Sequence, residues 1–298
     1  MTANTHLFGI VPPMTTPFRP DDTIDDAALR AETRYLIETG RVHGLAVTGS
    51  TGEGHALTTD EVRRITATVV DEARGRVPVI TGIITDSTAS AVERGLAVRD
   101  LGVAALQVTP VHYLFRPDDD AMVRHFETLA ARTGLPIIIY NVVPWTYLSP
   151  QLLARIIGAV PGVIGVKQSA GDMKLLADLL LLVADRSRIM SAVDALLYPS
   201  FALGAHGAIA AILTAVPALC VQLWDAVQGG DHKQALALHE KLLPIWNAIA
   251  HDNLPANVKH CQALMGRPAG VPRAPMPATS AAQADAIRRA LQGAGVLR

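Results

Sequence analysis

Lys167 places a positive charge inside the run VIGVKQSAG, residues 163–171, which otherwise has the composition of a buried strand. Apolar neighbours disfavour the ammonium form of a lysine and favour a neutral amine, which can attack a ketone to form a Schiff base. The alternative is a lysine at a strand end whose ammonium faces solvent or pairs with an acid such as Asp172. The run by itself leaves both interpretations open.

Tyr140 ends the apolar run PIIIYN, residues 136–141, directly before the run that holds Lys167. A phenol beside an imine-forming lysine can pass protons to and from the substrate hydroxyl, the carbinolamine and the leaving group. Taken alone, Tyr140 could equally cap the hydrophobic core with its hydroxyl in water.

The stretch TGSTGEG, residues 48–54, is rich in glycine and hydroxyl groups. Its glycines let the backbone approach a ligand, and its amides and hydroxyls can hold a carboxylate. It is neither a P-loop, because the P-loop lysine is absent, nor a nucleophile elbow, because Thr48 stands where the first glycine should be. We expect Glu53 to be a structural acid bonded to backbone amides.

The spacing of metal-ligand residue types does not predict a metal site. The ten histidines show no H-E-x-x-H cluster, and Cys220 and Cys261 form no C-x-x-C pair. The acidic run from Asp118 to Asp120 is typical of a helix N-terminal cap. We therefore expect no metal site.

Composition indicates a small-molecule partner. The 298 residues carry 26 Lys and Arg against 27 Asp and Glu, which lacks the basic excess of a nucleic-acid binder. The few cysteines favour a reducing compartment, and the N-terminus does not resemble a signal peptide, so we expect a cytoplasmic protein. The uncharged run at residues 207–224 contains Pro217, which favours a buried strand and a helix over a membrane span.

Eight β-rich runs alternate with helical patterns and indicate the elements that must position these side chains. The runs begin near residues 9, 44, 77, 104, 136, 163, 188 and 207. This alternation predicts an α/β fold, a (β/α)8 TIM barrel, over residues 1–225, with a C-terminal helical domain over residues 226–298. An open doubly wound sheet is the weaker alternative, because GIVPPMTTPF lacks a G-x-G-x-x-G loop. In such a barrel the active site forms at the C-terminal ends of the strands.

The motifs GSTGE, VTP, YN and GVKQSAGD follow one another on successive predicted strands. In this order they resemble the family of Schiff-base aldolases that includes N-acetylneuraminate lyase and dihydrodipicolinate synthase. The resemblance runs from TPF at residues 16–18 to LPANVK and PMP near the C-terminus. It implies a barrel with a helical C-terminal domain, a homotetramer, and cofactor-independent class I chemistry on pyruvate or a related 2-oxo acid.

The resemblance also implies roles for individual residues. Lys167 is the expected imine-forming lysine and Tyr140 the proton shuttle, while Ser50 and Thr51 bind the 2-oxo acid carboxylate and link the relay. The protonated imine acts as an electron sink, so the neighbouring carbon can be deprotonated to an enamine. That enamine can add to an aldehyde, the reverse reaction cleaves an aldol, and loss of hydroxide gives a dehydratase.

Departures from the family pattern concern the substrate. Trp145 occupies the position of the arginine with which the dipicolinate enzymes bind the carboxylate of their aldehyde substrate, and an indole cannot replace a bidentate clamp. His112 matches the relay tyrosine that a neighbouring subunit supplies, although Tyr113 follows directly. An imidazole there could relay protons near neutral pH.

After the seventh run, Asp194 is kept, while Ala192 and Ala195 replace a glycine and a glutamate of the neuraminate lyases. The expected substrate-binding set is Gly49, Ser50, Thr51, Trp145, Asp194 and Ile209. We expect aldol cleavage, condensation or dehydration of a 2-keto-3-deoxy-acid-type substrate. Dihydrodipicolinate synthase is the alternative enzyme, and a catalytically impaired, 2-oxo-acid-binding regulatory protein is the alternative from another class.

Overall fold

The eight predicted strands form one parallel sheet in the computed structural model, which describes residues 7–111 and 113–297. The strand order is β1-β8-β7-β6-β5-β4-β3-β2. The strands are β1 Gly9–Ile10, β2 Leu45–Val47, β3 Val79–Ile83, β4 Ala105–Val108, β5 Ile137–Asn141, β6 Val163–Gln168, β7 Arg188–Ser191 and β8 Gly207–Ala208.

The sheet closes on itself through the chain that follows β1. Pro13 forms a parallel bridge with Ala46 of β2. The Ala46 N–H donates to the Pro12 carbonyl at 3.0 Å, and the Met14 N–H donates to the Ala46 carbonyl at 2.8 Å. The predicted TIM barrel is therefore confirmed, and the open doubly wound sheet is wrong.

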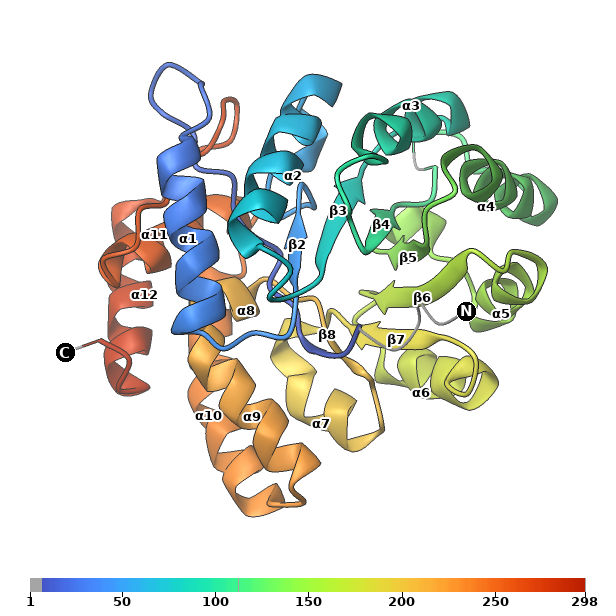
Figure 1. Ribbon diagram of the computed structural model, residues 1–298. Helices are drawn as coiled ribbons and strands as arrows, with labels where there is room; N and C mark the ends of the chain where they lie inside the picture. The colour runs from blue at the N-terminus through green and yellow to red at the C-terminus, as the bar shows by residue number, and fades with distance from the viewer. Residues whose placement is uncertain (1–6, 112, 298) are drawn as a thin grey trace.

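Helices surround the barrel (Figure 1). They are α1 Asp26–Glu38, α2 Thr59–Ala73, α3 Thr88–Val98, α4 Asp119–Thr133, α5 Pro150–Ala159, α6 Met173–Val183, α7 Leu197–Ala202, α8 Ile212–Ala215 and α9 Pro217–Gln228. The Asp25 and Asp118 side chains cap α1 and α4, and Thr58 forms a capping box with Glu61 at α2, so the cap predicted for the acidic run from Asp118 is confirmed. Short 3-10 turns, η2 Gly54–Ala56, η3 Pro144–Thr146 and η4 Asp194–Leu196, follow β2, β5 and β7.

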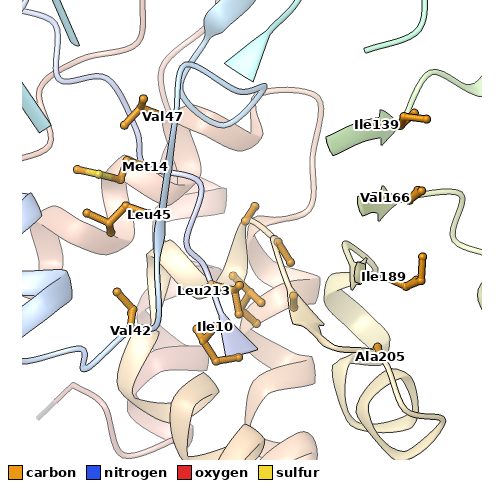
Figure 2. Packing of buried hydrophobic residues seen from close by; sticks show 14 of the residues in the cluster. Ile10, Met14, Val42, Leu45, Val47, Ile139, Val166, Ile189, Ala205 and Leu213 are labelled. Carbon is orange, nitrogen blue, oxygen red and sulfur yellow. The ribbon is translucent and has the colours of Figure 1, made fainter. Parts of the chain in front are cut away.

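Alternation along the strands decides which side chains face the barrel interior. Ile139, Val166 and Ile189, on β5, β6 and β7, belong to the hydrophobic cluster that packs between sheet and helices (Figure 2). Successive side chains of a strand point to opposite faces. Tyr140 and Lys167 follow two of these outward residues and therefore point into the barrel.

Three further helices follow the barrel, α10 His232–Ile249, α11 Leu254–Leu264 and α12 Ala281–Gly293. Helix α10 packs against α9, and α11 packs against α8. The predicted boundary at residue 225 lies within α9, and we propose that the C-terminal helical domain starts where the chain leaves that helix.

The uncharged run at residues 207–224 forms β8, α8 and the start of α9, with Pro217 in the first turn of α9. This confirms the prediction of a strand followed by helix. Within residues 7–111 and 113–297, no helix has both the length and the apolar character needed to cross a membrane.

His125 gives the folded protein a testable pH dependence. It is buried on α4, its Nδ1 lies 2.9 Å from the Thr88 hydroxyl, and burial lowers its pKa to about 4. The unfolded chain takes up this proton near its ordinary pKa of about 6.5, whereas the folded protein resists it, so the free energy of unfolding falls as pH drops from about 6.5 to 4.

We expect His125 to account for about 3 kcal/mol of this loss, which is the pKa difference converted at about 1.4 kcal/mol per unit. The variant His125→Asn keeps an amide that can reach Thr88 but cannot be protonated. Urea unfolding at pH 7 and pH 4 should therefore show a smaller loss in the variant. An equal loss in both proteins would show that His125 is not responsible.

Candidate active site

Lys167 and Tyr140 lie opposite each other on β6 and β5. Their side chains are only 3% and 5% exposed. The Lys167 Nζ lies 3.7 Å from the centroid of the Tyr140 ring, and the Tyr140 hydroxyl donates to the Ser50 Oγ at 3.2 Å. The Lys167 amine, the Tyr140 phenol and the Ser50 hydroxyl therefore form a continuous series of contacts.

The alternative interpretation of Lys167 as an exposed or Asp172-paired lysine is wrong. Asp172 is exposed and caps α6, where its carboxylate accepts the Lys174 N–H at 2.8 Å. In the part of the chain that the structure describes, no carboxylate lies within salt-bridge distance of the Lys167 Nζ. The Lys167 amine is therefore buried, and no described acid forms a salt bridge with it, which suits a nucleophile.

The Gly-rich turn after β2 brings Ser50 and Thr51 to this amine. Thr48 and Glu53, at the two ends of the turn, are in the left-handed region with φ of 55° and 57°. The turn leaves no room for a side chain at residue 54, since a Cβ on Gly54 would lie 1.9 Å from the Thr48 carbonyl oxygen. This close approach explains the glycine content of the stretch.

Glu53 is a structural acid, as expected, and it does not reach the amine. One carboxylate oxygen accepts the backbone N–H of Arg273 at 2.8 Å, and the other forms a buried ion pair with Lys259. Both oxygens are thereby engaged by the C-terminal part of the chain.

A cavity of about 430 Å³ opens above these residues, at the C-terminal ends of the strands. Of the predicted residues, its wall includes Ser50, Thr51, Tyr140, Lys167, Asp194 and Ile209. The wall also includes residues that the sequence did not predict, His55, Trp246, Asp252, Leu254, Pro255 and Met276. The last five come from α10, α11 and the segments around them, where no strand end marks a position as part of the site.

Asp194 is a buried acid in the cavity wall that interacts electrostatically with Lys167. It lies in η4 and accepts the Ile212 N–H at 2.8 Å. Burial raises its pKa to about 6, although the positive charge of Lys167 acts in the opposite direction. A carboxyl group at this position can accept hydrogen bonds from hydroxyl groups in the cavity.

Two predicted residues, Gly49 and Trp145, are not part of the cavity wall, and a third lies outside the described residues. Gly49 is buried under the turn, close to the amide of Gln107, and does not form part of the cavity wall. Trp145 is 64% exposed and lies outside the wall, where its Nε1 donates to the Tyr113 carbonyl at 3.2 Å. His112 is outside the described residues. Neither Gly49 nor Trp145 lines this cavity, and a direct substrate contact from either residue stays a prediction.

The comparisons with known proteins agree with this geometry. The sequence model of the Dihydrodipicolinate synthetase family matches residues 6–294. The chain is 33% identical to the 4-hydroxy-tetrahydrodipicolinate synthase of Methanopyrus kandleri, over 97% of each protein. It is 35% identical to the protein of the same name from Thermomicrobium roseum, over 96% of this chain and 94% of the relative.

Solved structures extend the similarity to enzymes with other names. The N-acetylneuraminate lyase of Fusobacterium nucleatum superimposes with a TM-score of 0.89 at 26% identity, over 98% of this chain and 100% of its own. YagE of E. coli, described as a dihydrodipicolinic acid synthase family protein in complex with pyruvate, has a TM-score of 0.92 at 25% identity, over 97% and 99%.

Proposed function

The chain belongs to the dihydrodipicolinate synthetase family, a family of pyruvate-dependent class I lyases and aldolases, and we propose that Lys167 forms the imine with a 2-oxo acid. The observation that carries this assignment is the buried amine 3.7 Å from the Tyr140 ring, whose hydroxyl donates to Ser50. A regulatory protein without turnover is not supported, because the family consists of enzymes.

The positions of these side chains support a separate role for each of them in the reaction. The Lys167 amine attacks the carbonyl carbon of the 2-oxo acid and gives up a proton, and the carbonyl oxygen takes a proton to give a carbinolamine. Loss of water then leaves an iminium between the Lys167 nitrogen and the substrate. The Tyr140 hydroxyl is placed to deliver and remove these protons. Its hydrogen bond to Ser50 lets it pass a proton on to the Ser50 hydroxyl. The hydroxyls and amides of Ser50 and Thr51 hold the carboxylate.

The iminium makes the next carbon acidic, and its deprotonation gives an enamine. In the cleavage direction, the iminium of the intact substrate loses the proton of its neighbouring hydroxyl group, the bond between this carbon and the hydroxyl-bearing carbon breaks, and the electron pair moves into the iminium. An aldehyde leaves, and protonation and hydrolysis of the resulting enamine release pyruvate and restore Lys167. In dehydration the substrate is not cleaved: the enamine formed by deprotonation of the intact iminium expels hydroxide from the hydroxyl-bearing carbon, and hydrolysis of the unsaturated iminium releases the product.

We propose a 2-keto-3-deoxy acid with an uncharged, hydroxylated tail as the substrate. Two carboxylates, Asp194 and Asp252, belong to the cavity wall, and Lys167 is the only lysine or arginine among the wall residues that the structure describes. The imine consumes that amine, so a second substrate carboxylate would face acids without a guanidinium partner. Hydroxyl groups can donate to both acids.

Dihydrodipicolinate synthesis from pyruvate and aspartate semialdehyde is the second candidate, because the relatives from Methanopyrus kandleri and Thermomicrobium roseum carry that activity in their names. We expect little condensation here, with kcat/KM at least about 100-fold below that for the best 2-keto-3-deoxy acid, since the aldehyde's carboxylate lacks a clamp. A panel of 2-keto-3-deoxy acids, assayed for pyruvate release and for loss of water, supplies the comparison. Efficient condensation with aspartate semialdehyde would contradict the proposed substrate class.

We also propose that the protein is a homotetramer, as the family resemblance implies. Tyr113, Leu114, Phe115 and Trp145 are large hydrophobic side chains that are between 62% and 80% exposed in the single chain. A contact between subunits would cover them. The role of His112 as a proton relay between subunits stays a prediction.

A further inference from the structure

We infer that the buried ion pair between Glu53 and Lys259 is a positioning device for the carboxylate-binding turn, so that helix α11 sets the affinity for pyruvate. This inference rests on the proposed function, because it assumes that Ser50 and Thr51 hold the 2-oxo acid carboxylate. Neither Glu53 nor Lys259 forms part of the cavity wall, so both act through other residues.

The ion pair is buried, and each partner also makes a hydrogen bond to the backbone. The Lys259 Nζ lies 2.6 Å from Glu53 Oε1, and the two side chains are 2% and 1% exposed. The same Nζ donates to the Val271 carbonyl at 2.7 Å, and the Arg273 N–H occupies the second oxygen of Glu53. Removal of either partner would leave an uncompensated buried charge, which is strongly destabilising. Separation of the two side chains is therefore unfavourable, and the intact pair holds the Glu53 side chain in place.

The position of Glu53 determines where the hydroxyl groups of Ser50 and Thr51 lie. Its backbone is held in the left-handed region, which a non-glycine residue adopts only when its surroundings enforce it. The Glu53 N–H donates to the Ser50 carbonyl at 3.0 Å, and Ser50 in turn accepts the hydrogen bond from Tyr140. A continuous series of contacts therefore links Lys259 to the relay through the turn.

Helix α11 contacts the cavity as well as the turn. Leu254 and Pro255, in its first turn, belong to the cavity wall, and Lys259 lies further along the same helix. A change in the contact between Lys259 and Glu53 therefore alters two walls of the site together.

A second buried ion pair provides a matched control. Arg267 Nη1 lies 2.9 Å from Glu32 Oε1, both side chains are 3% exposed, and Arg267 also donates to the carbonyls of Thr214 and Ala215. This pair likewise joins the C-terminal part of the chain to the barrel, but none of its residues contacts the turn or belongs to the cavity wall.

The test compares Lys259→Met with Arg267→Met in the full-length protein. Pyruvate binding is measured by calorimetry, Tm by thermal unfolding and kcat with the best substrate of the panel. We expect both variants to lose Tm, because each leaves a buried carboxylate without its cation. Only Lys259→Met should weaken pyruvate binding, by about 10- to 100-fold, with kcat at saturation changed by less than about threefold.

The double variant Glu53→Gln/Lys259→Met keeps the test decisive if Lys259→Met does not fold. It removes both charges, so Tm should recover, whereas pyruvate affinity should stay low because the turn has lost its anchor. Unchanged affinity in the folded variants, or an equal loss of affinity in Arg267→Met, would overturn the inference. If the unaltered protein binds no pyruvate at all, the proposed function itself fails, and that result is recognised before any variant is compared.

Discussion

Replacing Lys167 with methionine is expected to abolish turnover, with kcat at least about 10⁴-fold lower, because no other group of the site can form the imine. The thioether has a similar length and packs well against aromatic rings, so it can occupy the same place beside Tyr140. The folded protein should therefore be retained, and its Tm should not fall, since a buried amine has been removed.

The measurement is kcat with the best 2-keto-3-deoxy acid of the panel, together with Tm. Lys174→Met serves as the control, because Lys174 is exposed and pairs with Asp178 on α6, away from the cavity wall. The control should keep full activity. Turnover in Lys167→Met above about 1% of the starting value would show that the amine is not the nucleophile.

Replacing Tyr140 with phenylalanine is expected to lower kcat by about 10²- to 10³-fold, which is typical for the loss of a positioned proton-transfer group. The ring remains beside the Lys167 Nζ, but the hydroxyl that donates to Ser50 is lost. Pyruvate affinity should change by less than about threefold, because the hydroxyl transfers protons and does not hold the carboxylate.

Steady-state kinetics and pyruvate binding separate these effects. Tyr198→Phe is the control, since the Tyr198 hydroxyl contacts only the His232 ring, at 3.3 Å, among its described hydrogen-bond partners. This control should keep its kcat. A Tyr140→Phe enzyme with undiminished kcat would exclude the phenol from the relay, and a large loss of pyruvate affinity would assign it to binding instead.

Most of the barrel could be predicted from the sequence, because the patterns that indicate its strands and helices are local. Each apolar run contains one strand, and helices follow where capping residues such as Asp25, Thr58 and Asp118 stand. Strand lengths could not be predicted, because the length of a strand depends on how it pairs with its neighbouring strands. β1 and β8 are reduced to two residues each, at a point where a Cβ on Gly207 would lie 2.1 Å from the Gly9 carbonyl oxygen.

The site was predictable only where strand ends converge. Lys167, Tyr140 and the Ser50–Thr51 pair meet because their strands are neighbours or face each other across the barrel mouth. The wall residues Trp246 and Asp252 come from a helical region whose packing no periodic pattern reveals. The family resemblance assigned Trp145 to the site; the 3-10 turn Pro144–Thr146 carries it outside the cavity wall, and its contact with substrate stays a prediction.

Imine formation at Lys167 can be measured directly by borohydride reduction in the presence of pyruvate. Mass spectrometry of the digested protein should show the reduced pyruvyl adduct on Lys167, with activity lost in proportion to the modification. No adduct without pyruvate is expected, since reduction traps only an existing imine. An unmodified Lys167, or an adduct confined to other lysines, would contradict the assignment of the amine and the mechanism built on it.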